Sequence, residues 1–156
     1  MTTKNSSGEK LIASNKKAFH DYHVLDRMEA GLALMGTEVK SLRDGKANLS
    51  DAYVIFQKGE AWLLNAHISP YAHGNRENHE PLRSRKLLLH RRELGKLEAQ
   101  VRDKGLTIVP LRLFFRGRNA KVEIAVVRGK KLHDKRETER TKEADREAAS
   151  AMKARR

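Results

Sequence analysis

The chain has 156 residues, of which 33 are Lys or Arg and 20 are Asp or Glu, giving a formal net charge of +13. This length suits a single domain, and so large a positive charge indicates a polyanionic partner. The absence of cysteine excludes disulfides and thiolate metal sites, and no apolar run approaches the ~18 residues that a membrane span needs. The N-terminus also lacks the apolar core of a signal peptide, so we expect a cytoplasmic protein with no membrane association.

The first third of the chain begins with an irregular segment and continues with alternating apolar residues. Residues 1–14 are rich in Ser, Thr, Lys and Gly without periodicity, which predicts a flexible N-terminal arm. Residues 19–28 alternate enough to form a first strand, and Gly31 and Gly36 predict a bend or bulge where the strand continues. The segment 37–45 has an acidic residue in its first turn and a glycine at its end, which predicts a short helix.

The middle of the chain contains the clearest hairpin and the clearest helix. Two apolar runs on either side of Lys58-Gly59 predict a β-hairpin over residues 51–68. Residues 69–85 are polar and contain proline and glycine, which predicts a loop that is long for a compact domain. Residues 91–104 carry apolar side chains at helical spacing and are followed by a glycine, so we expect a helix there.

The last apolar segments predict two strands, residues 106–115 and 121–127, joined by the turn "RGRN". Pro110 indicates that the first of them lies at a sheet edge or carries a bulge. If side chains alternate uniformly along this strand, five of them share one face: Thr107, Val109, Leu111, Leu113 and Phe115. The whole pattern predicts a mainly β fold with flanking helices, an OB-fold-like closed antiparallel barrel of about six strands. We expect this domain to span residues 15–129.

Residues 130–156 form a basic C-terminal tail with ten basic and six acidic residues, a net charge of +4. Its opposite charges recur at helix-supporting spacing, but its apolar stripe is thin. Isolated helices are marginal in water, so we expect the tail to be disordered when free and helical when a partner supports it.

The sequence contains few features that are typical of a catalytic or metal site. Phosphate-cradling, dinucleotide-binding and nucleophile-elbow motifs are all absent. His20 and His23 would lie on opposite faces of a strand, which argues against a metal site. Glu29 and Glu38 flank the glycine-containing bend and could form a hydrolase pair, although most such acids are simply solvated. We therefore expect no enzyme activity, no metal and no cofactor.

Basic clusters carry more information. They comprise Arg83, Arg85, Lys86, Arg91 and Arg92 near the predicted helix, Arg116, Arg118 and Lys121 at the last hairpin, and Lys16 and Lys17 near the N-terminus. Any one cluster could be solvated surface, but several around one small barrel favour a nucleic-acid backbone. Aromatic residues make up only 5% of the chain, which favours recognition of a structured RNA by shape and phosphate contacts over reading of single-stranded bases.

Three segments carry a family resemblance: "EAGLALMGTEVKSLRDGKANLSDAYV", "RKLLLHRREL" and "GKKLHDKRE". Together they resemble the SsrA-binding protein (SmpB) family of bacteria, in register from about Asn15 to Glu137. The resemblance implies an OB-type barrel that binds the tRNA-like domain of tmRNA (SsrA RNA). It also implies delivery of tmRNA to stalled 70S ribosomes in trans-translation, contact with 16S rRNA, and a monomer when free.

The resemblance also assigns roles to single residues. It implies that Glu29, Leu88, Lys121 and Asn15 bind tmRNA. We expect Lys130 and Lys131 to bind tmRNA as well, through its phosphates. The resemblance implies that four residues of the tail contact the ribosome at the mRNA path and decoding centre: His133, Asp134, Lys135 and Arg136. We expect the helix of the tail to depend on Met152. Ala148 replaces a bulkier apolar residue common in the family, which puts contacts at that position in doubt. The alternative is a general basic ribosome-associated RNA-binding protein without preference for tmRNA.

Overall fold

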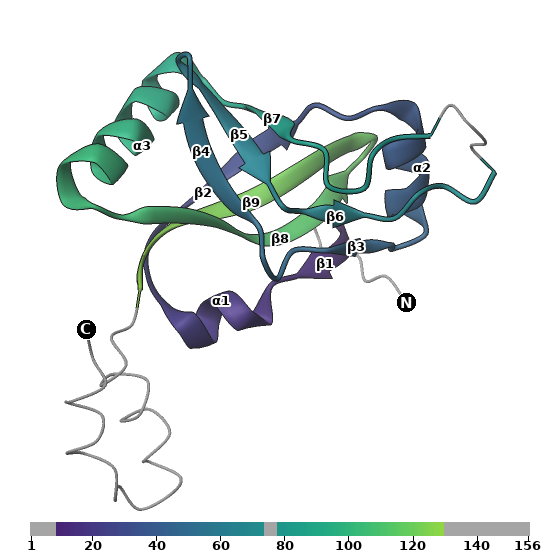
Figure 1. Ribbon diagram of the computed structural model, residues 1–156, viewed down its shortest axis with the longest axis horizontal. Coiled ribbons are helices and arrows are strands. Elements are labelled where there is room, and N and C mark those ends of the chain that lie inside the picture. Colours follow the sequence, from purple (N-terminus) through teal and green to yellow (C-terminus); the bar gives the residue numbers. More distant parts are fainter. Residues whose placement is uncertain (1–8, 74–77, 130–156) are drawn as a thin grey trace, which may run out of the picture.

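The computed structural model describes residues 9–73 and 78–129, which contain nine strands and three helices (Figure 1). In chain order these are β1 (Glu9–Ser14), α1 (Lys16–Asp21), β2 (Tyr22–Leu32), α2 (Gly36–Arg43), β3 (Ala47–Asn48), β4 (Tyr53–Gln57), β5 (Glu60–Leu64), β6 (His67–Ile68), β7 (Arg85–Leu88), α3 (Arg91–Lys104), β8 (Thr107–Arg116) and β9 (Asn119–Gly129). Within these residues no helix is both long and apolar enough to cross a membrane.

Six of the strands close into a ring. The order around it is β8, β4, β5, β7, β2 and β9, and β9 pairs again with β8. Every pair in the ring is antiparallel. Closure removes the exposed sheet edges that would otherwise favour aggregation. The expectation of a mainly β fold with a closed antiparallel arrangement of about six strands is confirmed.

Local sequence determines several of these elements as expected. Lys58 and Gly59 adopt positive φ angles of 55° and 75°, as a two-residue hairpin turn between β4 and β5 requires. The helix α3 ends at Lys104 and is capped by Gly105, whose φ of 65° is the left-handed conformation that a side chain disfavours. Both predictions are confirmed because turn and cap chemistry depend only on neighbouring residues.

The N-terminal predictions need two corrections. Residues up to Ser14 are not all an irregular arm, because Glu9–Ser14 form β1, which pairs with the second half of β8 outside the ring. Residues 19–21 belong to α1 rather than to a strand, and β2 starts only at Tyr22. The strand β1 forms because it pairs with β8, a tertiary contact that its six-residue sequence alone does not indicate.

The prediction of which β8 side chains share one face is also wrong, because the strand contains a bulge. The pairing with β9 shifts register between Pro110 and Arg112, which agrees with the bulge that Pro110 predicts. An extra residue in one strand reverses which side chains point inward. Ile108, Leu113 and Phe115 consequently face the main core, whereas Val109 and Leu111 pack in a second cluster with Ala18 of α1.

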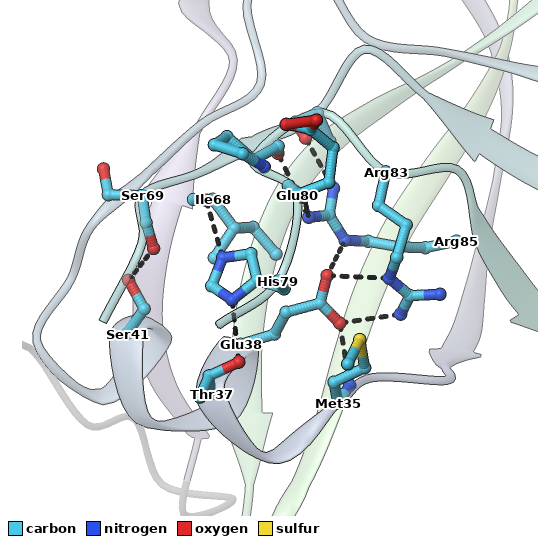
Figure 2. A network of polar contacts seen from close by, with 12 residues as sticks. Met35, Thr37, Glu38, Ser41, Ile68, Ser69, His79, Glu80, Arg83 and Arg85 are labelled. Carbon is cyan, nitrogen blue, oxygen red and sulfur yellow. Dashed lines mark hydrogen bonds and ion pairs between the residues drawn. The ribbon is translucent and has the colours of Figure 1, made fainter. Parts of the chain in front are cut away.

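A buried ion-pair cluster, the Glu38 cluster, joins α2 to Arg83 and to Arg85, the first residue of β7 (Figure 2). Glu38 and Arg85 are each 0% exposed, and Arg85 Nε donates to Glu38 Oε2 at 2.7 Å. Arg83 Nη2 donates to Glu38 Oε1 at 2.7 Å, and so does the backbone N–H of Met35, also at 2.7 Å. The remaining Arg85 donors bind backbone carbonyls, including Ala66 O at 2.6 Å. The cluster therefore fixes the chain that leads into β7.

The electrostatics of this cluster follow from burial and pairing together. Burial by itself would raise the pKa of the Glu38 carboxyl, but hydrogen bonds from Arg83, Met35 and Arg85 outweigh it and hold that pKa below its ordinary value. Burial lowers the pKa of the Arg85 guanidinium, and Glu38 offsets this only in part. Arg83 and Arg85 thus serve the fold, so the basic patch expected at residues 83–92 is smaller than the sequence indicates.

A second link in the same region runs through His79, which is 5% exposed. Its Nε2–H donates to Ile68 O at 2.9 Å, so Nδ1 is left to accept from the Thr37 hydroxyl, also at 2.9 Å. Figure 2 shows this imidazole between Thr37 of α2 and Ile68 of β6. Much of the predicted loop 69–85 is therefore tied to α2 where the structure describes it.

Candidate RNA interface

Three of the residues predicted to bind RNA lie close together on neighbouring strands. Gly31 of β2 pairs with Leu88 of β7 on one side and with Lys121 of β9 on the other. Glu29 is two residues before Gly31 on β2, so its side chain lies on the same face of the sheet as those of Leu88 and Lys121. Residues from three separate segments of the sequence thus meet on one surface.

This surface is hollowed into a groove of about 1260 Å³, which we call the β7–β9 groove. Its lining includes Glu29, Gly31, Leu88 and Lys121, together with Gly59 of the β4–β5 turn and Arg91 of α3. Figure 1 shows the start of α3 beside the β4–β5 hairpin, at the end of the ring where this groove lies. The groove is therefore bounded by the β4–β5 turn and the start of α3, and its floor is the β-sheet.

Gly31 allows Leu88 to lie across the floor of the groove. A Cβ atom placed on Gly31 would come within 3.1 Å of Leu88 Cβ, closer than ordinary van der Waals contact. Leu88, the last residue of β7, is 51% exposed. It offers an apolar platform on which a nucleotide base or ribose can pack.

The charge of the groove is mixed rather than uniformly basic. Its lining holds Lys86, Arg91 and Lys121 but also Glu29, Glu60, Glu93 and Glu98. Glu60 pairs with Lys86 Nζ at 2.9 Å. Glu93 accepts the backbone N–H of His90 at 3.0 Å in the N-terminal cap of α3. A groove of this kind suits hydrogen bonding to ribose hydroxyls and base amino groups as well as phosphate contact.

Glu29 makes a forked ion pair with Arg116 of β8. Arg116 Nη1 donates to Glu29 Oε1 at 2.5 Å, and Arg116 Nη2 donates to Oε2 at 2.7 Å. Arg116 Nη2 also bonds to Glu9 of β1. The hydrogen bonds that Arg116 donates to Glu29, and to a smaller degree to Glu9, raise the pKa of its guanidinium. The sequence assigns Arg116 only to a basic cluster, because its two acidic partners lie 87 and 107 residues away along the chain.

The structure places Asn15 away from this groove. Asn15 is 2% exposed and caps α1, accepting the N–H of Ala18 at 3.2 Å. Its amide nitrogen donates to Leu49 O at 3.1 Å and to Pro110 O at 2.9 Å. All its side-chain polar atoms are thus used within the fold, and Asn15 does not line the groove. Its geometry is that of a residue that locks α1 onto the barrel.

Seven of the predicted site residues belong to the tail and lie outside the described residues: Lys130, Lys131, His133, Asp134, Lys135, Arg136 and Met152. Among residues 9–73 and 78–129, no group of three or more His, Asp or Glu side chains is placed to hold a metal ion. His20 lies in α1 and His23 in β2.

Comparison with known proteins gives consistent matches. The family model described as SmpB protein matches residues 12–154. An SsrA-binding protein of Geobacter sulfurreducens is 57% identical over 146 residues, covering 94% of this chain and 95% of that protein. An SsrA-binding protein of Carboxydothermus hydrogenoformans is 55% identical over 147 residues, covering 94% and 99%.

A solved structure described as "tmRNA-SmpB: a journey to the center of the bacterial ribosome" contains a chain with the same fold. It superposes with a TM-score of 0.66 at 46% identity, covering 87% of this chain and 95% of that one.

Proposed function

The chain belongs to the SmpB protein family, and we propose that it is an RNA-binding adaptor for tmRNA. In this role it binds the tRNA-like domain of tmRNA and delivers it to stalled ribosomes for trans-translation. The observation that carries the proposal is the meeting of Glu29, Leu88 and Lys121 on one groove. The chain supplies no chemistry of its own in this role. It acts in the cytoplasm, as a monomer before it meets its RNA.

The predicted tmRNA-binding residues have separate roles in this proposal. Lys121 contacts a phosphate, and Leu88 packs against a base or ribose. Glu29 accepts a hydrogen bond from a 2′-hydroxyl or a base amino group, both of which are donors. Asn15 acts from a distance by holding α1 in place, because its side chain is buried and satisfied.

The tail has the ribosomal task. The strand β9 ends at Gly129, which pairs with Tyr22 of β2. Beyond it, we propose that Lys130 and Lys131 contact phosphate. His133, Asp134, Lys135, Arg136 and Met152 contact 16S rRNA near the mRNA path, where the tail becomes helical.

Truncation after Gly129 tests this division of tasks. We expect the truncated protein to bind the tRNA-like domain almost as tightly as the full chain, but to lose tagging of stalled peptides in a reconstituted translation system. Loss of RNA binding together with tagging contradicts the division. A full-length variant with Lys130 and Lys131 changed to alanine tests separately what these two residues contribute to RNA binding and to tagging.

A general basic RNA-binding protein is the second candidate, favoured by the net charge of +13. Gel-shift titrations with the tRNA-like domain and with bulk tRNA, at about 50 and 200 mM salt, separate the two candidates. The adaptor prefers the tRNA-like domain at both salt concentrations, and Glu29→Ala weakens that binding. A general polyanion binder shows no preference, and removal of a negative charge leaves its binding unchanged or tighter.

A further inference from the structure

We propose that Arg116 is a positioning residue of the RNA interface, which holds the Glu29 carboxylate in the orientation that accepts a hydrogen bond from RNA. This inference rests on the proposed function, because it assigns Glu29 to the bound RNA. Arg116 itself acts on Glu29 and not on a phosphate.

The geometry of the pair supports this role. The guanidinium meets both oxygens of Glu29 through two different nitrogens, Nη1 at 2.5 Å and Nη2 at 2.7 Å. A forked contact of this type fixes the plane of the carboxylate, whereas a single ammonium contact leaves it free to rotate. An ionised carboxylate has about four acceptor positions, so two of them stay open for a donor in the groove.

Arg116 is itself held by groups other than Glu29. Its Nη2 bonds to Glu9, whose side chain is 7% exposed. Its guanidinium carbon lies 5.4 Å from the centre of the Phe114 ring, which is 0% exposed. An arginine over an aromatic face gains cation–π attraction. Two fixed partners therefore set the position of the guanidinium before Glu29 is considered.

The charge of this arrangement argues against direct phosphate binding by Arg116. Two carboxylates, Glu9 and Glu29, neutralise the guanidinium and occupy both of its terminal nitrogens. A phosphate would have to displace one of these acids. Lys121 also lines the groove, and no salt bridge among the described residues involves it. It is the better phosphate ligand of the two.

A double-mutant cycle with the tRNA-like domain of tmRNA tests the proposal in the full-length protein. Arg116→Gln and Glu29→Gln should each weaken binding by about tenfold, and the double variant should be no weaker than the weaker single variant. The slope of log affinity against log salt should stay that of wild type for Arg116→Gln, because no phosphate contact is lost. Arg116→Lys keeps the charge without the fork and should recover only part of the affinity.

Arg112→Gln provides the matched control. Arg112 lies on the same strand, stacks on Phe114 at 4.5 Å and pairs with Glu9 at 3.3 Å. Its ion pairs among the described residues are with Glu9 and Glu123, and not with Glu29. We expect this variant to bind RNA as wild type does. Should Arg116→Gln fail to fold, as judged by circular dichroism, Arg116→Lys and Glu9→Gln carry the test. The Glu9 variant should weaken binding by about threefold, with the salt slope unchanged.

Two results overturn the inference. One is additive losses in the cycle. The other is a salt slope that falls by about one phosphate contact in Arg116→Gln, the behaviour of a direct phosphate ligand. Failure of the proposed function looks different: wild type itself then shows no preference for the tRNA-like domain over bulk tRNA.

Discussion

The protein uses the same chemistry, an arginine paired with a glutamate, in two very different places. In the Glu38 cluster, Glu38 and Arg85 are fully buried and join α2 to the first residue of β7. The Glu29–Arg116 pair lies beside the groove, with the two side chains 37% and 41% exposed. Removing one partner of a buried pair is costly, because the other charge stays in a medium of low dielectric. An exposed pair contributes little to stability and is free to serve a ligand.

The largest expected effect on the free energy of unfolding comes from the buried Glu38–Arg85 pair. Glu38→Gln leaves the Arg85 guanidinium buried without a counter-charge and should lower the free energy of unfolding by about 3–5 kcal/mol, measured by urea denaturation. The double variant Glu38→Leu/Arg85→Met removes both charges and should be less destabilised than Glu38→Gln. A single variant within 1 kcal/mol of wild type, on the order of a surface substitution, contradicts this account.

Acid should remove the same stabilisation by protonating Glu38. The pKa of this carboxyl is lowered in the folded state, so its contribution is complete above the unfolded pKa of about 4.3 and declines as the pH falls through the folded value. The stability difference between wild type and Glu38→Gln should therefore be largest near neutral pH and shrink below about pH 4. Urea denaturation of both proteins from pH 3 to 7 measures it, and a difference independent of pH would show that Glu38 does not act through its charge.

A smaller effect is expected for the neutral hydrogen bond beside the Glu38 cluster. Thr37→Val removes the hydroxyl that donates to His79 Nδ1 at 2.9 Å while keeping the shape of the side chain. The expected loss is about 1 kcal/mol, measured by thermal and urea unfolding. Thr37→Ser keeps the hydroxyl and serves as the control, which should stay closer to wild type than Thr37→Val.

The smallest effect on stability should come from the exposed pair. Glu29→Gln removes a surface charge and should change the free energy of unfolding by only about 0.5 kcal/mol. The same variant should nevertheless weaken binding of the tRNA-like domain. A loss of stability as large as that of Glu38→Gln would mean that both pairs are structural, and the comparison would then fail.

Local sequence was sufficient for part of the fold. The β4–β5 hairpin, the helix α3 and the alternation of β9 each follow from neighbouring residues, since turn type, capping and periodicity are short-range properties. Family resemblance located Glu29, Leu88 and Lys121, and the structure brings these three to one groove. It could not show that Asn15 lies buried elsewhere, because a motif carries no information about exposure.

Charge alone also gave a misleading view of the arginines. Arg83, Arg85 and Arg116 all read as surface cations in the sequence. Arg83 and Arg85 are bound to Glu38, more than 40 residues earlier, and Arg116 to Glu29 and Glu9. An arginine and its distant carboxylate become partners only after the strands have paired, so no local pattern distinguishes a buried arginine from a solvated one.

By itself, the sequence determined the fold class, the basic character, the β4–β5 hairpin, the bounds of α3, and the family. The tertiary structure decided the order of strands around the ring, the pairing of β1 with β8, and the change of faces at the Pro110 bulge. It also decided which charges support the fold and which face the groove. The physical reason is range: turns and periodicity act over a few residues, whereas burial and ion pairing depend on contacts that only the closed barrel creates.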